Sequence, residues 1–378
     1  MNEEFKRKLK AYENGELSGS ELEEFEKELE KLEIYQEILE GEESEAKPTI
    51  KEEKQKMILK RSKWMARLQT SITVLGLIFL FTIVTSVLTA VYYSWGKPDR
   101  VDVYRNVIDY TLTVTDPYGY FGGTSTNTKA FFGLEATRDL NKQVGDEVTT
   151  VGEMKVDFLF SMMSYPETDY DVSISQNQPV FSYPNSGDEN YTDWSRLEKL
   201  PDGTVMSAFL SFKDLIETEE VLKRFEGKDM EIVWLAVDTG QEKNEDGIVF
   251  DPIGFPSFPI WHEDDMILES REEEKGLFGS VISEGHSSPD YNIGDQEILH
   301  KQFIKTLSFL KKYESKANKL YYGELNLADR IEYLNKNGFH HYGVVVTGPT
   351  KEILKLKEEN WIREITVDEV ELWNWSER

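Results

Sequence analysis

The stretch SITVLGLIFLFTIVTSVLTAVYY, residues 71–93, decides how this chain is organised. It contains no charged residue and no proline, and Leu, Ile, Val, Phe and Thr dominate it. As a helix rising about 1.5 Å per residue it reaches roughly 35 Å, whereas the hydrocarbon core of a bilayer is about 30 Å thick. Because lipid offers no partners to backbone N–H and C=O groups, a spanning segment must be helical. We therefore predict one transmembrane helix over residues 71–93.

A buried core helix and a cleaved signal peptide are the alternatives to a membrane anchor. Apolar residues occupy every face of the predicted helix, and no polar stripe marks a boundary with water, as a soluble core helix would have. A signal peptide places its apolar stretch close to the N-terminus and ends in a small-residue cleavage site. This stretch begins about seventy residues along the chain and lacks such a site. The sequence therefore favours an uncleaved anchor.

The charges on the two sides of the span predict its orientation. Residues 48–70 carry seven Lys or Arg and two Glu, a net charge of +5, whereas only Lys97 and Arg100 follow the span closely. Lys and Arg flanking a span are retained on the cytoplasmic side. We expect a single-pass protein of the cell membrane, with a cytoplasmic N-terminus and residues 97–378 outside. The segment 48–70 reads as a basic juxtamembrane helix attracted to anionic membrane lipid.

Composition excludes several kinds of site. The chain of 378 residues has a net charge of −28; residues 1–47 contribute −9, and the part in or beyond the span contributes −24. A domain of that sign repels phosphate, so we expect no direct binding of nucleic acid. The chain has no cysteine, which excludes thiolate zinc sites, iron–sulfur clusters and cysteine nucleophiles.

Residues 1–47 read as an acidic cytoplasmic segment of amphipathic helices. Apolar residues recur at helical spacing before and after an interruption at Asn14-Gly15. A segment this short cannot bury a large core. Its helices therefore either pack as a small bundle or present their apolar faces to a partner. In the second case they bind by helix-in-groove recognition, and the many Glu residues steer a basic partner. The predicted partner-binding residues are Phe5, Leu9, Tyr12, Leu22, Phe25, Leu29, Leu32 and Tyr35.

Residues Tyr12–Leu39, YENGELSGSELEEFEKELEKLEIYQEIL, resemble the N-terminal region of the sigma factor regulator family, in particular its Bacillus-type membrane-bound anti-sigma factors. The layout of acidic helices, one span and a large outer domain is also similar. The resemblance implies an anti-sigma factor that sequesters an extracytoplasmic-function sigma factor and works with a companion membrane protein. Zinc-containing anti-sigma domains carry an H-x-x-x-C-x-x-C signature, from which this cysteine-free chain departs.

One face of the predicted span carries small residues. Thr82, Ser86 and Ala90 recur every four residues, so the backbone of a second helix could approach closely along them. The alternative is that small hydroxyl residues are merely tolerated in the span. We take these three residues as the predicted helix interface for a companion membrane protein.

The outer domain is predicted to be α/β or α+β, with possible subdomains at 97–202 and 203–378. Alternation of apolar and polar residues predicts strands, among them Tyr110–Val114, Lys129–Leu134 and Lys155–Ser161.

A strand–helix–strand order then occurs twice, over 205–237 and over 342–370, and predicts parallel pairing within each unit. The alternative is that this likeness arises by chance. Ile293–Tyr313 and Leu325–Asn337 read as helices, the second ending at Gly338.

No motif in the outer domain indicates catalysis. G-x-S-x-G, H-E-x-x-H and P-loop patterns are absent from the sequence. His262 with the acidic residues 263–265 offers metal-ligand types, but adjacent residues do not converge on one point, so we favour a solvated acidic loop. We expect no enzymatic activity, no cofactor and no metal. A membrane-anchored cell-envelope enzyme, or a scaffold whose tail only tethers it, is the alternative to an anti-sigma factor.

Overall fold

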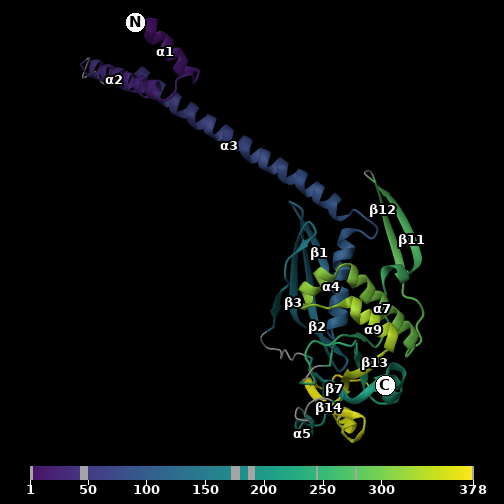
Figure 1. Ribbon diagram of the computed structural model, residues 1–378. Coiled ribbons are helices and arrows are strands. Elements are labelled where there is room, and N and C mark those ends of the chain that lie inside the picture. Colours follow the sequence, from purple (N-terminus) through teal and green to yellow (C-terminus); the bar gives the residue numbers. More distant parts are fainter. Residues whose placement is uncertain are drawn as a thin grey trace. The chain divides into compact units, whose positions relative to one another are not determined.

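The computed structural model describes residues 3–42, 50–171, 179–185, 192–243, 246–276 and 279–376. The chain forms two compact units, Met1–Leu80 and Phe81–Arg378. The first unit consists of helices and the second is rich in β-sheet (Figure 1). The predicted helical N-terminal region is therefore confirmed.

The N-terminal unit contains α1 (Glu3–Glu13), α2 (Ser20–Glu42) and the first part of α3 (Ile50–Tyr93). Between α1 and α2 the chain turns at Gly15 and Gly19, whose φ angles are 70° and 64°. Glycine adopts these left-handed angles without a clash because it has no Cβ. The interruption expected at Asn14-Gly15 is thus the turn that folds α1 against α2.

Helix α3 is the one helix of the described chain that is long and apolar enough to cross a membrane. Only 11% of its most apolar window is buried, which distinguishes it from the core helix of a soluble protein. Its hydroxyl side chains bond within the helix: Thr73 donates to the carbonyl oxygen of Gln69 at 2.9 Å, and Ser86 donates to that of Thr82 at 2.8 Å. These hydroxyl donors are therefore satisfied within the helix, as a membrane-spanning helix would require.

Helix α4 (Arg100–Thr115) opens the main part of the second unit. The carboxylate of Asp99 caps it by accepting the N–H of Asp102 at 2.9 Å. Helix α4 is buried on several sides because it contributes Val107 to one core and Val114 to another. The strand predicted at Tyr110–Val114 is therefore wrong. Because most faces of this helix carry apolar residues, apolar and polar residues alternate over a short stretch of it, as they do in a strand.

The first sheet is antiparallel throughout and packs one face on α4. The strand predicted at Lys155–Ser161 falls mostly within its third strand. The one predicted at Lys129–Leu134 is wrong as a single strand, because the turn at residues 130–132 divides it between the first two strands. The strands are β1 (Ser125–Lys129), β2 (Gly133–Val144), β3 (Glu147–Leu159), β4 (Met162–Met163) and β5 (Glu167–Tyr170).

The second sheet has the order β10-β8-β13-β7-β14 and is also antiparallel. It contains both predicted strand–helix–strand units. The first is β7 (Thr204–Glu217), α6 (Thr218–Phe225) and β8 (Glu231–Val237), and the second is β13 (His340–Pro349), α10 (Thr350–Leu354) and β14 (Ile362–Leu372). Strand β10 (Gly254–Pro256) adds the edge next to β8.

The predicted parallel pairing within each unit is wrong. Strand β13 lies between β7 and β8, and β7 lies between β13 and β14. Each unit keeps its two strands parallel, but a strand of the other unit separates them, as in the split βαβ arrangement of ferredoxin-like folds. The two units are thus interleaved in one sheet.

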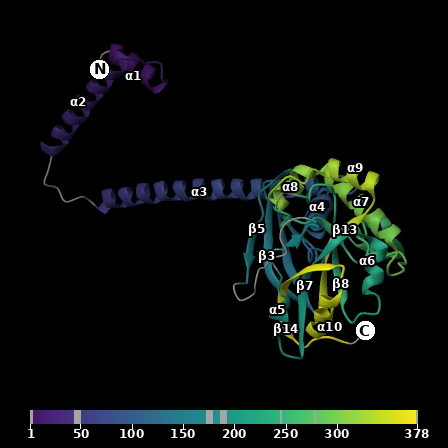
Figure 2. The ribbon, with the colours of Figure 1, turned by 60° about the horizontal axis from the view of Figure 1, so that its bottom comes forward.

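Three helices gather on one side of the second compact unit (Figure 2): α7 (Gln296–Lys312), α8 (Glu314–Tyr321) and α9 (Leu327–Asn337). Two of them confirm the predicted helices, and Gly338, with φ of 79°, ends α9 as expected. The two sheets fall on either side of the expected boundary after residue 202, although 81–378 form one compact unit. The smaller elements are β6 (Phe181–Ser182), α5 (Trp194–Leu197), β9 (Ile248–Val249), η1 (Glu263–Asp265), β11 (Ile267–Gly276), β12 (Gly279–Ser287) and η2 (Lys355–Glu358).

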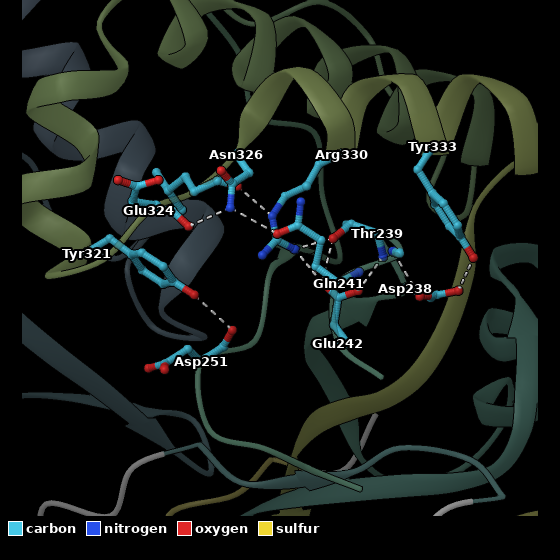
Figure 3. Close-up of polar contacts among 12 residues, drawn as sticks. Asp238, Thr239, Gln241, Glu242, Asp251, Tyr321, Glu324, Asn326, Arg330 and Tyr333 are labelled. Carbon is cyan, nitrogen blue, oxygen red and sulfur yellow. Dashed lines mark hydrogen bonds and ion pairs between the residues drawn. The ribbon is translucent and has the colours of Figure 1, made fainter. Parts of the chain in front are cut away.

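A buried ion pair fastens α9 to the loop after β8 (Figure 3). Arg330 and Glu242 are both buried and in contact. The Nε of Arg330 also donates to the carbonyl oxygen of Leu325 at 2.7 Å, and Glu242 accepts the N–H of Thr239 at 2.8 Å. Paired charges with further hydrogen bonds offset the cost of their desolvation. The sequence pattern did not indicate this cluster.

Candidate partner-binding site

The α1–α2 hairpin carries a surface groove of about 760 Å³, which we call the α1–α2 groove. Its apolar wall comes from one face of each helix, and its polar wall comes from α2. The apolar residues are Phe5, Leu9, Tyr12, Leu29, Leu32 and Tyr35, and the polar ones are Glu26, Glu30, Glu33 and Gln36. Six of the eight predicted partner-binding residues therefore line one groove.

Phe25 has a different position from these six. It is only 1% exposed, and its ring lies 5.5 Å from that of Phe5 and 5.6 Å from that of Tyr12. Phe25 is thus the packing centre of the hairpin and supports the groove from beneath. Leu22, the other predicted residue, is half-buried outside the groove lining.

Several groove residues are open to a partner. The exposed fractions of Leu32 and Tyr35 are 48% and 65%. Apolar side chains this exposed, on a helix whose other faces are charged, lose contact with water when a complementary surface covers them. The three Glu residues on the rim place negative charge beside the apolar floor, which favours a partner with an apolar ridge flanked by basic residues.

The predicted helix interface at Thr82, Ser86 and Ala90 lies next to a second row of residues on α3, Thr85 and Thr89, which is covered by the protein itself. Ser86 and Ala90 are exposed, whereas Thr85 and Thr89 are buried. The hydroxyl of Thr89 accepts the backbone N–H of Phe132 at 2.8 Å, from the turn between β1 and β2.

Tyr93 completes this attachment of α3 to the first sheet. Its hydroxyl lies 2.9 Å from the carbonyl oxygen of Phe132 and 3.1 Å from that of Phe160. We call Thr89, Tyr93, Phe132 and Phe160 the helix clamp. Sequence reasoning missed it, although the repeat of Thr85, Thr89 and Tyr93 at intervals of four residues was a visible signal.

The acidic segment at His262 does not form a metal site. The His262 ring is buried, its Nε2 lies 2.9 Å from Oγ1 of Thr306, and burial lowers its pKa to about 4. Lys305 binds both Asp264 and Asp265 at 2.7 Å. The two aspartates thus pair with an ammonium and His262 pairs with a hydroxyl, and within the described residues no group of three or more His, Cys, Asp or Glu could hold a metal ion.

Comparison with known proteins decides the family. Over 384 aligned residues the chain is 30% identical to the probable anti-sigma-M factor YhdL of Bacillus subtilis (strain 168), and the alignment covers 99% of this chain and 100% of that protein. The chain belongs to the sigma factor regulator family. The family models described as sigma factor regulator N-terminal and sigma factor regulator C-terminal match residues 56–149 and 197–369 of this sigma factor regulator. No solved structure matches it.

The two matched regions follow the architecture of this sigma factor regulator. The N-terminal region covers most of α3, all of α4 and the β1–β2 hairpin, and the C-terminal region covers the interleaved sheet. The resemblance noted at Tyr12–Leu39 lies outside both regions. The α1–α2 groove is included only in the full-length alignment.

Proposed function

We propose that this sigma factor regulator is a membrane-bound anti-sigma factor that sequesters an extracytoplasmic-function sigma factor in its α1–α2 groove. The single observation that carries the proposal is an exposed apolar groove with an acidic rim, in a chain similar over its full length to a probable anti-sigma factor. A regulator of this kind needs no catalytic residues, so we propose no enzymatic activity.

Sequestration follows from the chemistry of the groove. An apolar helix of the sigma factor fills the space lined by Leu29, Leu32 and Tyr35, and the rim glutamates pair with basic residues of its DNA-contacting surface. A sigma factor held in this way keeps its basic surface covered and stays at the membrane. Both effects reduce its binding to promoter DNA.

The proposed topology places the groove in the cytoplasm. Residues 1–47 form the sigma-binding segment, 48–70 the basic juxtamembrane helix, 71–93 the span and 97–378 the outer domain. The positive charge before the span supports this orientation. The outer domain senses the state of the cell envelope, and the helix clamp ties it to the end of α3.

Co-purification of the full-length chain with a co-expressed extracytoplasmic-function sigma factor tests the proposal. Replacing Leu32 and Tyr35 together by Asp forces carboxylates into an apolar contact without a bonding partner. We expect the variant to insert in the membrane but to lose about 100-fold or more in affinity, and the genes controlled by the sigma factor to be expressed constitutively.

Ile34→Asp is the matched control. Ile34 lies between these two residues on α2, and it is exposed but outside the groove lining. It should keep wild-type binding. Failure of the wild-type chain to retain any sigma factor, or equal retention by all variants, would refute groove-mediated sequestration.

A further inference from the structure

Two turns of the first sheet end in exposed apolar side chains. We call residues 130–133 and 159–162 the hairpin tips: they comprise the β1–β2 and β3–β4 turns with the adjoining ends of β2, β3 and β4. Neither tip contains a charged residue. Their apolar side chains remain largely exposed: 49% for Phe131 and 64% for Met162. Isolated exposed apolar residues are ordinary, but several on adjacent turns indicate a contact surface.

The two tips form one surface around the end of α3. The rings of Phe132 and Phe160 stack at 4.4 Å, and the ring of Tyr92 meets each of them edge-on at 5.9 and 5.6 Å. Phe131 reaches further back along the helix, to within 5.8 Å of the ring of Phe81. The hairpins of the first sheet therefore lie alongside the last turns of α3 (Figure 1).

The contact with Phe81 sets the depth of this surface. Phe81 follows Arg67, the last basic residue before the span, by fourteen residues of continuous helix. At the α-helical rise, Phe81 is about 21 Å along the helix from Arg67. Counted from Arg67 as the inner boundary, Phe81 therefore lies within a hydrocarbon core about 30 Å thick. Thr89, which binds the backbone of Phe132, is about 33 Å from Arg67 and so near the outer boundary. The Phe131 ring is thus held beside a lipid-facing part of the helix.

The backbone of the tips points to a role other than local stability. Phe131, Phe132 and Phe160 have φ angles of 63°, 61° and 55°. Turn positions with left-handed angles favour Gly, Asn or Asp, because other side chains clash with the backbone there. Aromatic residues at three such positions cost backbone energy, and residues held in this way cluster at functional sites.

A band of ion pairs lies directly behind the tips. Glu135 is 2.6 Å from both Lys129 and Lys155, which lower its pKa to about 2. These charged residues lie further along the strands, and the apolar residues lie on the turns and at the strand ends beside them. An apolar end followed by a charged band matches the change from hydrocarbon to headgroups at a bilayer surface.

We propose that the hairpin tips insert into the outer leaflet of the membrane beside α3. This inference rests on the proposed membrane anchoring. Lipid is the occupant because the apolar surface is continuous with that of the span. Three contacts, to the helix, to the leaflet and between the tips, then hold the first sheet at a fixed height on the bilayer.

Site-directed fluorescence on the full-length chain tests the insertion. Because the chain has no cysteine, one substitution gives one labelled site. The variants Phe131→Cys and Met162→Cys report on the tips, Ile78→Cys reports on the span, and Asp202→Cys reports on an exposed turn whose side chain is 93% accessible. Each carries an environment-sensitive label in vesicles of phosphatidylethanolamine and phosphatidylglycerol, and is quenched by brominated acyl chains or by aqueous iodide.

We expect brominated lipid to quench both tip labels at least about half as strongly as the Ile78 label, and iodide to quench them at least about five-fold less than the Asp202 label. Tip labels that behave like Asp202, with Ile78 quenched by lipid, would overturn the insertion and leave the anchor standing. An Ile78 label that lipid does not quench would overturn the anchor itself. Tip labels shielded from both quenchers would mean that protein, such as a second copy, covers the tips.

Discussion

Tyr93, the last residue of α3, lies with its hydroxyl 2.9 Å from the carbonyl oxygen of Phe132, whose own N–H donates to Thr89 one turn earlier on α3 at 2.8 Å. Both backbone groups of this turn residue thus bond to one helix, and its carbonyl oxygen also accepts the N–H of Phe160 at 2.9 Å. Movement of the first sheet relative to the end of α3 has to break these bonds. In the proposed topology, this is where a change in the outer domain would reach the span.

Removing the Tyr93 hydroxyl should loosen the clamp. Tyr93→Phe keeps the ring but removes the hydroxyl donor that two carbonyl oxygens share. The carbonyl oxygen of Phe132 keeps the N–H of Phe160 at 2.9 Å, whereas that of Phe160 loses this donor, and we expect a loss of about 1–3 kcal/mol in the free energy of unfolding. Urea unfolding in detergent and amide exchange at Phe132 would measure it. Ser94→Ala is the control, because that hydroxyl is exposed and bonds within its own helix. Equal unfolding midpoints for the two variants would contradict the clamp.

Phe25→Ala should affect the groove by unfolding it. Truncating a buried Phe costs about 3–5 kcal/mol, which exceeds what a two-helix hairpin with one buried ring can sustain. We expect reduced helical circular dichroism together with lost sigma-factor binding. A Leu32→Asp variant should lose binding at unchanged helicity. If Phe25→Ala kept full helicity and lost binding, Phe25 would be a contact residue instead.

The small-residue face of the span should matter for a companion membrane protein. Replacing Ser86 and Ala90 by Leu widens the closest approach of two helices and forfeits dispersion contacts, without hindering membrane insertion. Co-purification of a membrane partner, or self-association in a membrane two-hybrid assay, should fall, while Leu80→Ala leaves it intact. Equal association for both variants would assign this face to lipid.

The buried pair of Arg330 and Glu242 should be sensitive to the loss of one partner. Glu242→Ala leaves the guanidinium buried without its counter-charge, and we expect about 3–5 kcal/mol of lost stability. Lys355→Ala, which breaks an exposed pair with Glu352, should cost at most about 1 kcal/mol. Thermal unfolding of both variants measures the contrast. Similar losses would show that burial does not determine the strength of these pairs.

Asp116 should give the stability of the second unit, residues 81–378, a distinct pH dependence. Burial raises the pKa of this carboxyl from 3.8 to about 6. The native state therefore binds more protons than the unfolded state between about pH 4 and 6, so this group's contribution to stability falls as pH rises through that window and is constant above it. Asn keeps an acceptor for the N–H of Tyr118.

Asp116→Asn should therefore gain stability relative to wild type as pH rises from 4 to 7, by up to about 3 kcal/mol for a shift of two units. Urea unfolding at each pH measures this difference. Asp202→Asn, at a side chain that is 93% accessible, is the control for the loss of one carboxylate charge. A difference between Asp116→Asn and wild type that does not change with pH would contradict the raised pKa.

Sequence periodicity predicted the helices whose apolar residues form one continuous surface. The predicted helices at 293–313 and 325–337 match α7 and α9 within a few residues, and the apolar stretch 71–93 lies within the longer helix α3, because each presents a continuous apolar face or surface. The order of strands and helices in the second sheet was also predictable. Its pairing was not, because apolar strands such as β7 and β13 match several partners equally well, and only tertiary packing chooses among them.

The two wrong strands have local causes. Helix α4 is buried by two sheets, so its apolar residues do not form the single stripe that identifies a helix. The β1–β2 turn carries Phe at left-handed positions where Gly or Asn would have signalled a turn. In the N-terminal unit the groove residues were identified, but nothing in their spacing separated Phe25, which packs inside, from the residues that stay exposed.

In the interleaved sheet, a strand that is synthesised early pairs with strands that are synthesised much later. Every residue of β7 from Thr204 to Phe212 is buried in the finished sheet, yet both of its neighbours, β13 and β14, are synthesised only after roughly 120 further residues. At about 5–20 residues per second the nascent β7 waits about 6–25 s with both edges unpaired. An apolar strand in that state is a template for aggregation, so we expect folding of this domain to be helped by a holding chaperone. A ribosome that stalls before residue 340 leaves a product that cannot complete its sheet.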